Sequence, residues 1–281
     1  MINRPHSLLV CFFVLLLAPL LMGRSYPWLT SGQPPADTLA RRFPAPAGFE
    51  RVPLQANSFA CWLRHLPLKD ADAKVLLYPT EKGIAKANQA AGVAVVALDV
   101  MPYQQCADAI IRLRCEHFWA TGRADALVFH FTSGDACSWR AWRSGLRPVV
   151  SGSRVSWRKT GPADSGRKHF VRYMHTLMAY CGTASLREEL RPIRCEDLSV
   201  GDVIIQGGHP GHAVLVLDIV VDDAGTRKML LGQSYMPAQE FHVLANPGAS
   251  GPWYDLGFRS LPTPEWLFTD SDCCTWPQTG R

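Results

Sequence analysis

A cysteine and a histidine stand at positions where their chemistry could be used. Cys106 falls in the first turn of a predicted helix, and His212 begins an apolar run directly after the turn-forming residues GGHPG. A helix N-terminus stabilises a thiolate through its dipole and its unpaired N–H groups. An imidazole beside the sulfur would lower the thiol pKa further. The two residues therefore predict nucleophilic thiol chemistry, provided that the fold brings them together.

Three strands in the final third of the chain must position His212. They are predicted over 202–206, 213–221 and 228–233, because these runs are apolar and segments rich in turn residues separate them. Short connections make them an antiparallel meander. Polar or amphipathic side chains near the strand ends are candidates for holding a peptide or a sugar: Gln206, His209, Ser234, Tyr235 and Gln239. The segment QSYMPAQ can equally be a turn that satisfies its own backbone.

The helix that carries Cys106 is predicted over 103–120, with apolar side chains at helical spacing and Gly122 as its end. Further helices are predicted over 58–66, capped by Ser58, over 168–180, and after Ser185, which forms a capping box with Glu188. The remaining segments are predicted as strands over 74–78, 92–100 and 126–131, and as an inserted loop region over 133–166. The pattern indicates an α+β fold in which helices pack on one face of an antiparallel sheet.

The segment LSVGDVIIQGGHPGHAVLVLD resembles the sheet of NlpC-type papain-like cysteine hydrolases, which cleave peptidoglycan peptides. The resemblance lies in the Gly201-Asp202 turn, the hairpin that follows it and the strand that His212 leads. It implies a papain-like core with insertions, in which Cys106 is the nucleophile, His212 its base and Gln233 the group that orients the imidazole. The chain departs from that family in its QQCADA motif and in the long separation between Cys106 and Gly201, which an insertion over 133–166 would absorb.

A second resemblance covers nearly the whole chain after its first fifty residues. The segments FERVPLQANSFACWLRHLPL, QQCADAIIRLR, YCGTASLREEL, GDVIIQGGHPGHAVLVLD and LLGQSYMPAQEFHVLANP resemble an exported bacterial family, the domain of unknown function 4846. In that family the position of Cys106 is usually cysteine, whereas those of Cys61, Cys115 and Cys181 need not be. The resemblance therefore favours Cys106 as the functional cysteine.

The chain begins like an exported protein. Arg4 precedes an uncharged apolar run from Leu8 to Met22, which Pro19 interrupts and which is shorter than a comfortable membrane span. We predict a signal peptide over 1–25, a Pro/Gly-rich arm over 26–48, one α+β domain over 49–270 and a polar tail over 271–281. The alternative is an uncleaved anchor, and this segment would then be the protein's contact with a membrane. The expected location is the periplasm or the exterior.

Charge and cysteine content exclude several functions. The net charge of +5 is mild and interleaved with acidic residues, so nucleic-acid binding is not expected. An oxidising compartment permits disulfides among the cysteines after the signal, but the pairing cannot be read from the sequence. His209 and His212 lack a third ligand at a suitable spacing, so neither zinc nor another cofactor is expected.

These features predict an exported, metal-independent thiol hydrolase that acts on an amide bond of cell-wall peptide or a related substrate. Backbone N–H groups at the start of the Cys106 helix would stabilise the oxyanion. The alternative is a non-catalytic envelope protein that binds glycan or peptide in the same cleft, where Cys106 only packs. Two further alternatives are Cys181 as the nucleophile and a glycosidase that pairs Glu116 with Asp202 or Asp218.

Overall fold

The structure is a computed structural model that describes residues 25–29 and 36–277. The predicted signal peptide lies outside the described residues except for Ser25. No helix within the described ranges is long and apolar enough to span a membrane.

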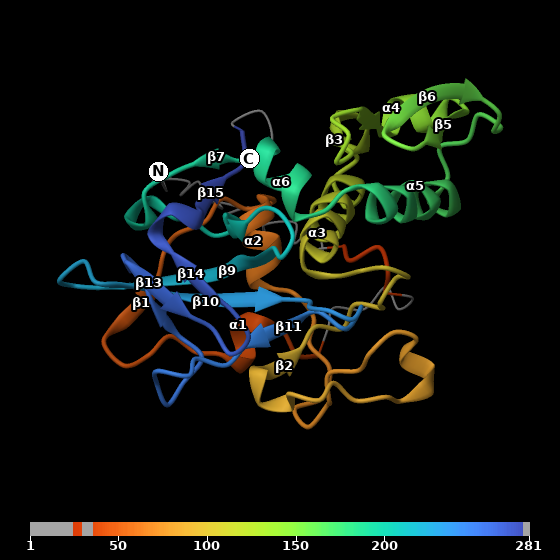
Figure 1. The fold of residues 1–281 in the computed structure, drawn as a ribbon. Coiled ribbons are helices and arrows are strands. Elements are labelled where there is room, and N and C mark those ends of the chain that lie inside the picture. Colours follow the sequence, from red (N-terminus) through yellow and green to blue (C-terminus); the bar gives the residue numbers. More distant parts are fainter. Residues whose placement is uncertain (1–24, 30–35, 278–281) are drawn as a thin grey trace, which may run out of the picture.

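One antiparallel sheet forms the centre of the molecule (Figure 1). Its strands run in the order β2-β11-β10-β9-β8-β15-β7, while β1 also pairs with β9 and β12 with β10. The three predicted strands of the final third are β8 (Val203–Gln206), β9 (His212–Asp222) and β10 (Arg227–Gln233), each antiparallel to the next. The meander and the α+β class are therefore confirmed. The other strands of the sheet are β1 (Phe49–Arg51), β2 (Gly92–Val95), β7 (Arg191–Pro192), β11 (His242–Leu244), β12 (Tyr254–Asp255) and β15 (Cys273–Thr275).

Two helices predicted from the sequence pack against β9. α3 (Cys106–Ala120) starts at the cysteine, three residues after the predicted start, and the Gln105 backbone N–H donates to the Asp108 carboxylate at 2.9 Å, which caps its first turn. Gly122 ends it with a left-handed φ of 69°. α2 (Phe59–Arg64) begins after Ser58, whose hydroxyl accepts the Cys61 N–H at 3.0 Å.

The other described elements surround this core. The helices are α1 (Leu39–Arg42), α4 (Trp139–Arg143), α5 (Arg167–Tyr180) and α6 (Thr183–Glu189). Three two-stranded ribbons pair β3 (Val128–His130) with β4 (Ala136–Ser138), β5 (Leu146–Ser151) with β6 (Arg154–Lys159), and β13 (Ser260–Pro262) with β14 (Leu267–Thr269). Single 3₁₀ turns lie at Thr80–Lys82, Gln89–Ala91, Ala124–Ala126, Cys195–Asp197 and Asp270–Asp272.

The predicted strand over 74–78 is wrong, because side chains take the backbone groups that a strand ladder would use. The Gln89 amide bonds both the N–H and the C=O of Val75, at 3.0 and 2.9 Å, and the Glu240 carboxylate accepts the Leu76 N–H at 2.9 Å. Only isolated bridges remain, at Leu76 and Leu77. The segment is therefore a loop tied down by its neighbours.

The stretch 133–166 is not the loop region that its polar and aromatic composition indicates. It contains β4, α4, β5 and β6, and Ser138 caps α4 by accepting the Ala141 N–H at 3.2 Å. Trp139 and Trp142 are buried in the core, so the aromatic residues pack inward. This insertion lies to one side of the central sheet, beyond α5 (Figure 1).

Two predicted boundaries also need correction. Ser185 is not the cap of α6: the helix starts at Thr183, and the Ser185 hydroxyl accepts the Gly182 N–H from within its first turn, at 3.1 Å. The polar tail predicted from residue 271 contains β15, which lies between β8 and β7 in the sheet. Trp276 is buried as well, so the domain continues through that residue.

A carboxylate lies fully buried in the middle of β9. Asp218 accepts the Nε–H groups of Arg51 and Arg64, both at 2.7 Å, and the Ile219 backbone N–H at 2.9 Å. It therefore joins β9 to β1 and to α2 through charge-assisted hydrogen bonds. The negative charge is tolerated in the core only because both cations reach it.

We expect Asp218→Ala to lower the free energy of unfolding by about 3–5 kcal/mol, because it leaves two arginines beside an empty site in the core. Urea unfolding followed by circular dichroism measures the change. The matched control is Asp223→Ala, which removes an exposed carboxylate from the β9–β10 turn and should leave the midpoint unchanged. Equal midpoints for both variants would contradict the role of Asp218.

Candidate functional site

α3 packs on β9, so the start of the helix that carries Cys106 lies near the start of the strand that carries His212. Cys106 is the first residue of α3, and the backbone N–H groups of Ala107 and Ala213 lie close enough to its thiol to favour the thiolate. Ala213 directly follows His212 at the start of β9. The thiol therefore lies beside the backbone of the histidine strand.

The His212 imidazole is held from the neighbouring strand. Its Nε2 lies 2.7 Å from Oε1 of Gln233, the last residue of β10. Its Nδ1 is buried and has no hydrogen-bond partner among the described residues. The ring therefore presents one unengaged nitrogen, although no hydrogen bond joins it to the thiol. Such contacts are often long in free enzymes and tighten when substrate binds.

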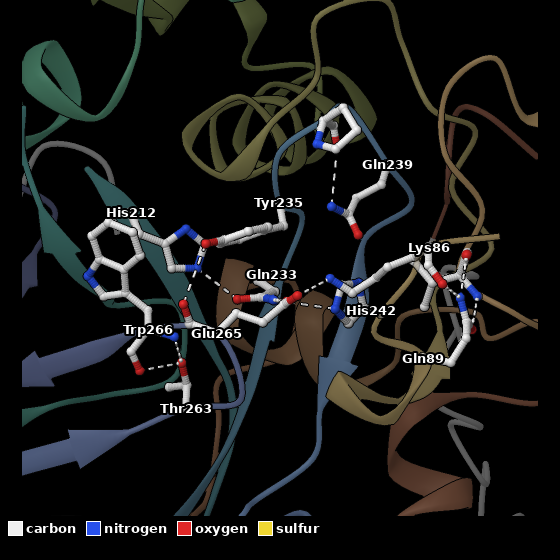
Figure 2. Close-up of polar contacts among 12 residues, drawn as sticks. Lys86, Gln89, His212, Gln233, Tyr235, Gln239, His242, Thr263, Glu265 and Trp266 are labelled. Carbon is white, nitrogen blue, oxygen red and sulfur yellow. Dashed lines mark hydrogen bonds and ion pairs between the residues drawn. The ribbon is translucent and has the colours of Figure 1, made fainter. Parts of the chain in front are cut away.

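Aromatic rings enclose the imidazole. Tyr235 meets it edge-on at 4.9 Å between ring centroids, Trp266 lies at 5.3 Å and Phe268 stacks at 5.7 Å. Figure 2 shows Trp266 and Tyr235 on two sides of His212, with the Gln233 amide below it. Burial among these rings lowers the pKa of His212 to about 4.

Burial has the opposite effect on the thiol. It raises the pKa of Cys106 to about 11, although the hydrogen bonds from Ala107 and Ala213 act to lower it. Both groups are therefore neutral at pH 7. The expected depression of the thiol pKa is not found, because loss of hydration outweighs the nearby backbone N–H groups in this closed site.

The polar residues predicted to hold substrate fall into two groups. Ser234 and Gln239 are buried and serve their own turn: the Ser234 hydroxyl donates to the Gln239 carbonyl at 2.7 Å, and the Gln239 amide donates to the Pro237 carbonyl at 3.1 Å. Tyr235 packs against His212, and its hydroxyl donates to the Glu265 carbonyl at 3.4 Å. The turn interpretation of QSYMPAQ therefore accounts for Ser234 and Gln239.

Gln206 and His209 lie at the β8–β9 turn, on the other side of the histidine. The Gln206 carbonyl accepts the Trp266 indole N–H at 3.0 Å, and its amide donates to Asp272 at 2.8 Å. His209 is exposed. A cavity of about 1090 Å³ opens beside this turn, between β3 and the first turns of α6. Gln206 lines it, whereas Cys106 and His212 do not, so this hollow is next to the site and not part of it.

Three residues of the site carry no local signal in the sequence. The Gln233 amide nitrogen donates to Glu265 at 2.7 Å and lies 3.4 Å from Nε2 of His242, and Lys86 forms an ion pair with Glu265 (Figure 2). Lys86 lies in the loop before β2 and Glu265 in the turn between β13 and β14, so they are 179 residues apart in the sequence. Only the fold brings them to Gln233.

The geometry does not favour the glycosidase alternative or Cys181 as the nucleophile. Glu116 is buried and bound to Arg167 at 2.7 Å, and Asp218 is bound to two arginines, so neither faces a cleft as a glycosidase requires. Asp202 is also buried and accepts the Thr275 hydroxyl at 2.6 Å. The Cys181 thiol donates to the His130 carbonyl at 3.3 Å. No group of three potential metal ligands occurs among the described residues.

Comparison with known proteins identifies the family. No curated protein and no solved structure matches the chain. The family model described as domain of unknown function (4846) matches residues 39–274. This range runs from α1 to β15 and includes Cys106, His212, Gln233 and Glu265. The chain therefore belongs to the family of the domain of unknown function 4846.

Proposed function

We propose that the protein is an exported thiol hydrolase of the papain-like, NlpC-type class, which cleaves an amide bond of cell-wall peptide or a related substrate without a metal or cofactor. One observation carries the proposal. A histidine whose Nε2 is bound to a glutamine at 2.7 Å keeps Nδ1 without a partner, and the next residue of its strand, Ala213, has its backbone N–H near the Cys106 thiol. This is the order of groups in a cysteine hydrolase triad.

The resting pair is neutral, so His212 acts as a general base. As the Cys106 sulfur attacks the scissile carbonyl, the thiol proton passes to Nδ1 of His212, and the carbonyl becomes a tetrahedral oxyanion. Backbone N–H groups in the first turn of α3 stabilise that charge. The imidazolium then gives its proton to the departing amine, which leaves a thioester on Cys106. A water molecule, deprotonated by His212, attacks the thioester to release the acid and restore the thiol.

Exposed apolar side chains next to the triad provide a surface for a peptide. Tyr103, three residues before the thiol, is 70% exposed, and Met236, three residues after Gln233, is 42% exposed. Their segments touch, because the Ser234 hydroxyl lies 3.4 Å from the Gln104 carbonyl. Tyr103 also has a left-handed φ of 67°, an unfavourable conformation for tyrosine that functional sites often contain.

Incubation with purified peptidoglycan and synthetic stem peptides, followed by mass spectrometry of the products, tests the activity. We expect Cys106→Ser and His212→Ala to abolish turnover while their circular dichroism spectra stay unchanged. Cys181→Ser is the matched control and should retain full activity. Turnover that persists in His212→Ala, or that disappears in Cys181→Ser, would contradict the assignment.

The rate should depend on pH through His212. Only the neutral imidazole accepts the thiol proton, and its pKa is lowered to about 4. We therefore expect kcat/KM to be constant near neutral pH and to fall tenfold per pH unit once the pH drops below about 4. A pH-rate profile, with circular dichroism at each pH to verify folding, measures this dependence. A midpoint near the ordinary histidine value of about 6.5 would show that an exposed imidazole, not His212, controls the rate.

A second function is favoured by the closed state of the thiol, which is only 4% exposed and whose pKa is raised to about 11. In that alternative the protein binds glycan or peptide and Cys106 only packs. A peptidyl chloromethyl ketone separates the two functions. The hydrolase should be alkylated at Cys106 and lose this labelling in His212→Ala. The binding protein should show no selective labelling at Cys106, and Cys106→Ser should leave its affinity for peptidoglycan unchanged.

A further inference from the structure

Gln233 is itself held by two groups that can only accept a hydrogen bond. The Glu265 carboxylate, paired with Lys86, accepts from the Gln233 amide nitrogen at 2.7 Å. Nδ1 of His242 lies 2.9 Å from the Glu240 carbonyl and must donate to it, so Nε2 of His242 carries a lone pair. That nitrogen lies 3.4 Å from the Gln233 amide nitrogen. The two amide hydrogens of Gln233 are therefore both accounted for.

This arrangement determines which end of the amide faces His212. If the Gln233 side chain turned over, its carbonyl oxygen would lie against the Glu265 carboxylate and the His242 lone pair, and both contacts would be repulsive. With the amide nitrogen fixed on that side, Oε1 faces the His212 ring at 2.7 Å. A carbonyl oxygen only accepts, so Nε2 of His212 must carry the hydrogen. Nδ1 then keeps its lone pair.

We propose that Glu265, held by Lys86 and assisted by His242, is a positioning residue that selects the Nε2–H tautomer of His212 and so leaves Nδ1 as the base for Cys106. The role in catalysis rests on the proposed hydrolase function, whereas the choice of tautomer does not. Figure 2 shows the chain of contacts from Lys86 through Glu265 and Gln233 to His212. Glu265 touches neither the thiol nor the imidazole nitrogen that would take its proton.

Burial makes this control effective. His212, Gln233 and His242 are fully buried, and Lys86 is only 5% exposed, so water does not readily replace any of these contacts. Burial also lowers the pKa of His242 to about 4, which keeps that ring neutral and its Nε2 an acceptor at neutral pH. The tautomer of an exposed histidine has no such constraint.

Nitrogen NMR of the histidine-labelled protein reads the tautomer directly. In the native protein we expect a pyridine-like shift for Nδ1 of His212 and a pyrrole-like shift for Nε2, with the signals assigned by their loss in His212→Asn. Glu265→Gln replaces the pure acceptor by a group that can also donate. The Gln233 amide can then turn over, and a second population with hydrogen on Nδ1 should appear.

The double variant Lys86→Met/Glu265→Gln makes the same test without leaving a buried lysine unpaired. Glu81→Gln is the matched control: it changes an exposed glutamate and should leave both shifts unchanged. On a cleaved peptide, we expect both Glu265 variants to lower kcat about tenfold or more with little change in KM, since the wrong tautomer removes the general base.

The outcomes separate the two proposals. Hydrogen on Nδ1 of His212 in the native protein, or an unchanged tautomer in both Glu265 variants, would overturn the role of Glu265 whether or not the protein hydrolyses peptides. The expected native tautomer and its loss in the variants support that role even if no peptide is cleaved, in which case only the hydrolase function fails.

Discussion

The antiparallel pairing of β9 with β10 is the interaction on which the candidate site depends. Because the strands run in opposite directions, the start of β9 lies beside the end of β10, so His212 meets Gln233. Gly232 permits a close approach at this point, since a Cβ there would lie 2.6 Å from Leu217 and 2.7 Å from Phe241. α3 packs on β9, and its first residue, Cys106, lies near the same end of these two strands.

Burial determines the protonation states of Cys106 and His212 at these strand ends. The helix start and the neighbouring backbone N–H groups favour a thiolate, but removal of water raises the thiol pKa and lowers the pKa of the imidazole. The free energy of hydration lost on burial exceeds what a few N–H groups return. The site is therefore organised around a proton transfer between neutral groups, and its geometry matters more than its resting charge.

The sequence predicts those parts of the fold that local periodicity controls. The meander over 202–233 and the helix predicted over 103–120 follow from apolar spacing and from turn residues, and both are confirmed, although the helix starts at Cys106. Residues 74–78 have the composition of a strand, yet the Gln89 and Glu240 side chains take their backbone groups. The contact between Lys86 and Glu265 joins loops far apart in the sequence, so no local sequence pattern predicts it. The resemblance to NlpC-type hydrolases implies roles for His212 and Gln233, but it implies none for Glu265.

The position of β15 has a consequence for the order of folding. Among the described strands, β7 pairs with β15 alone, which the chain reaches about eighty residues later. During synthesis from the N-terminus, β7 and the outer edge of β8 keep unpaired backbone groups until Cys273–Thr275 is made. An unpaired strand edge tends to pair with other chains, so the late arrival of β15 completes the sheet and also protects this edge.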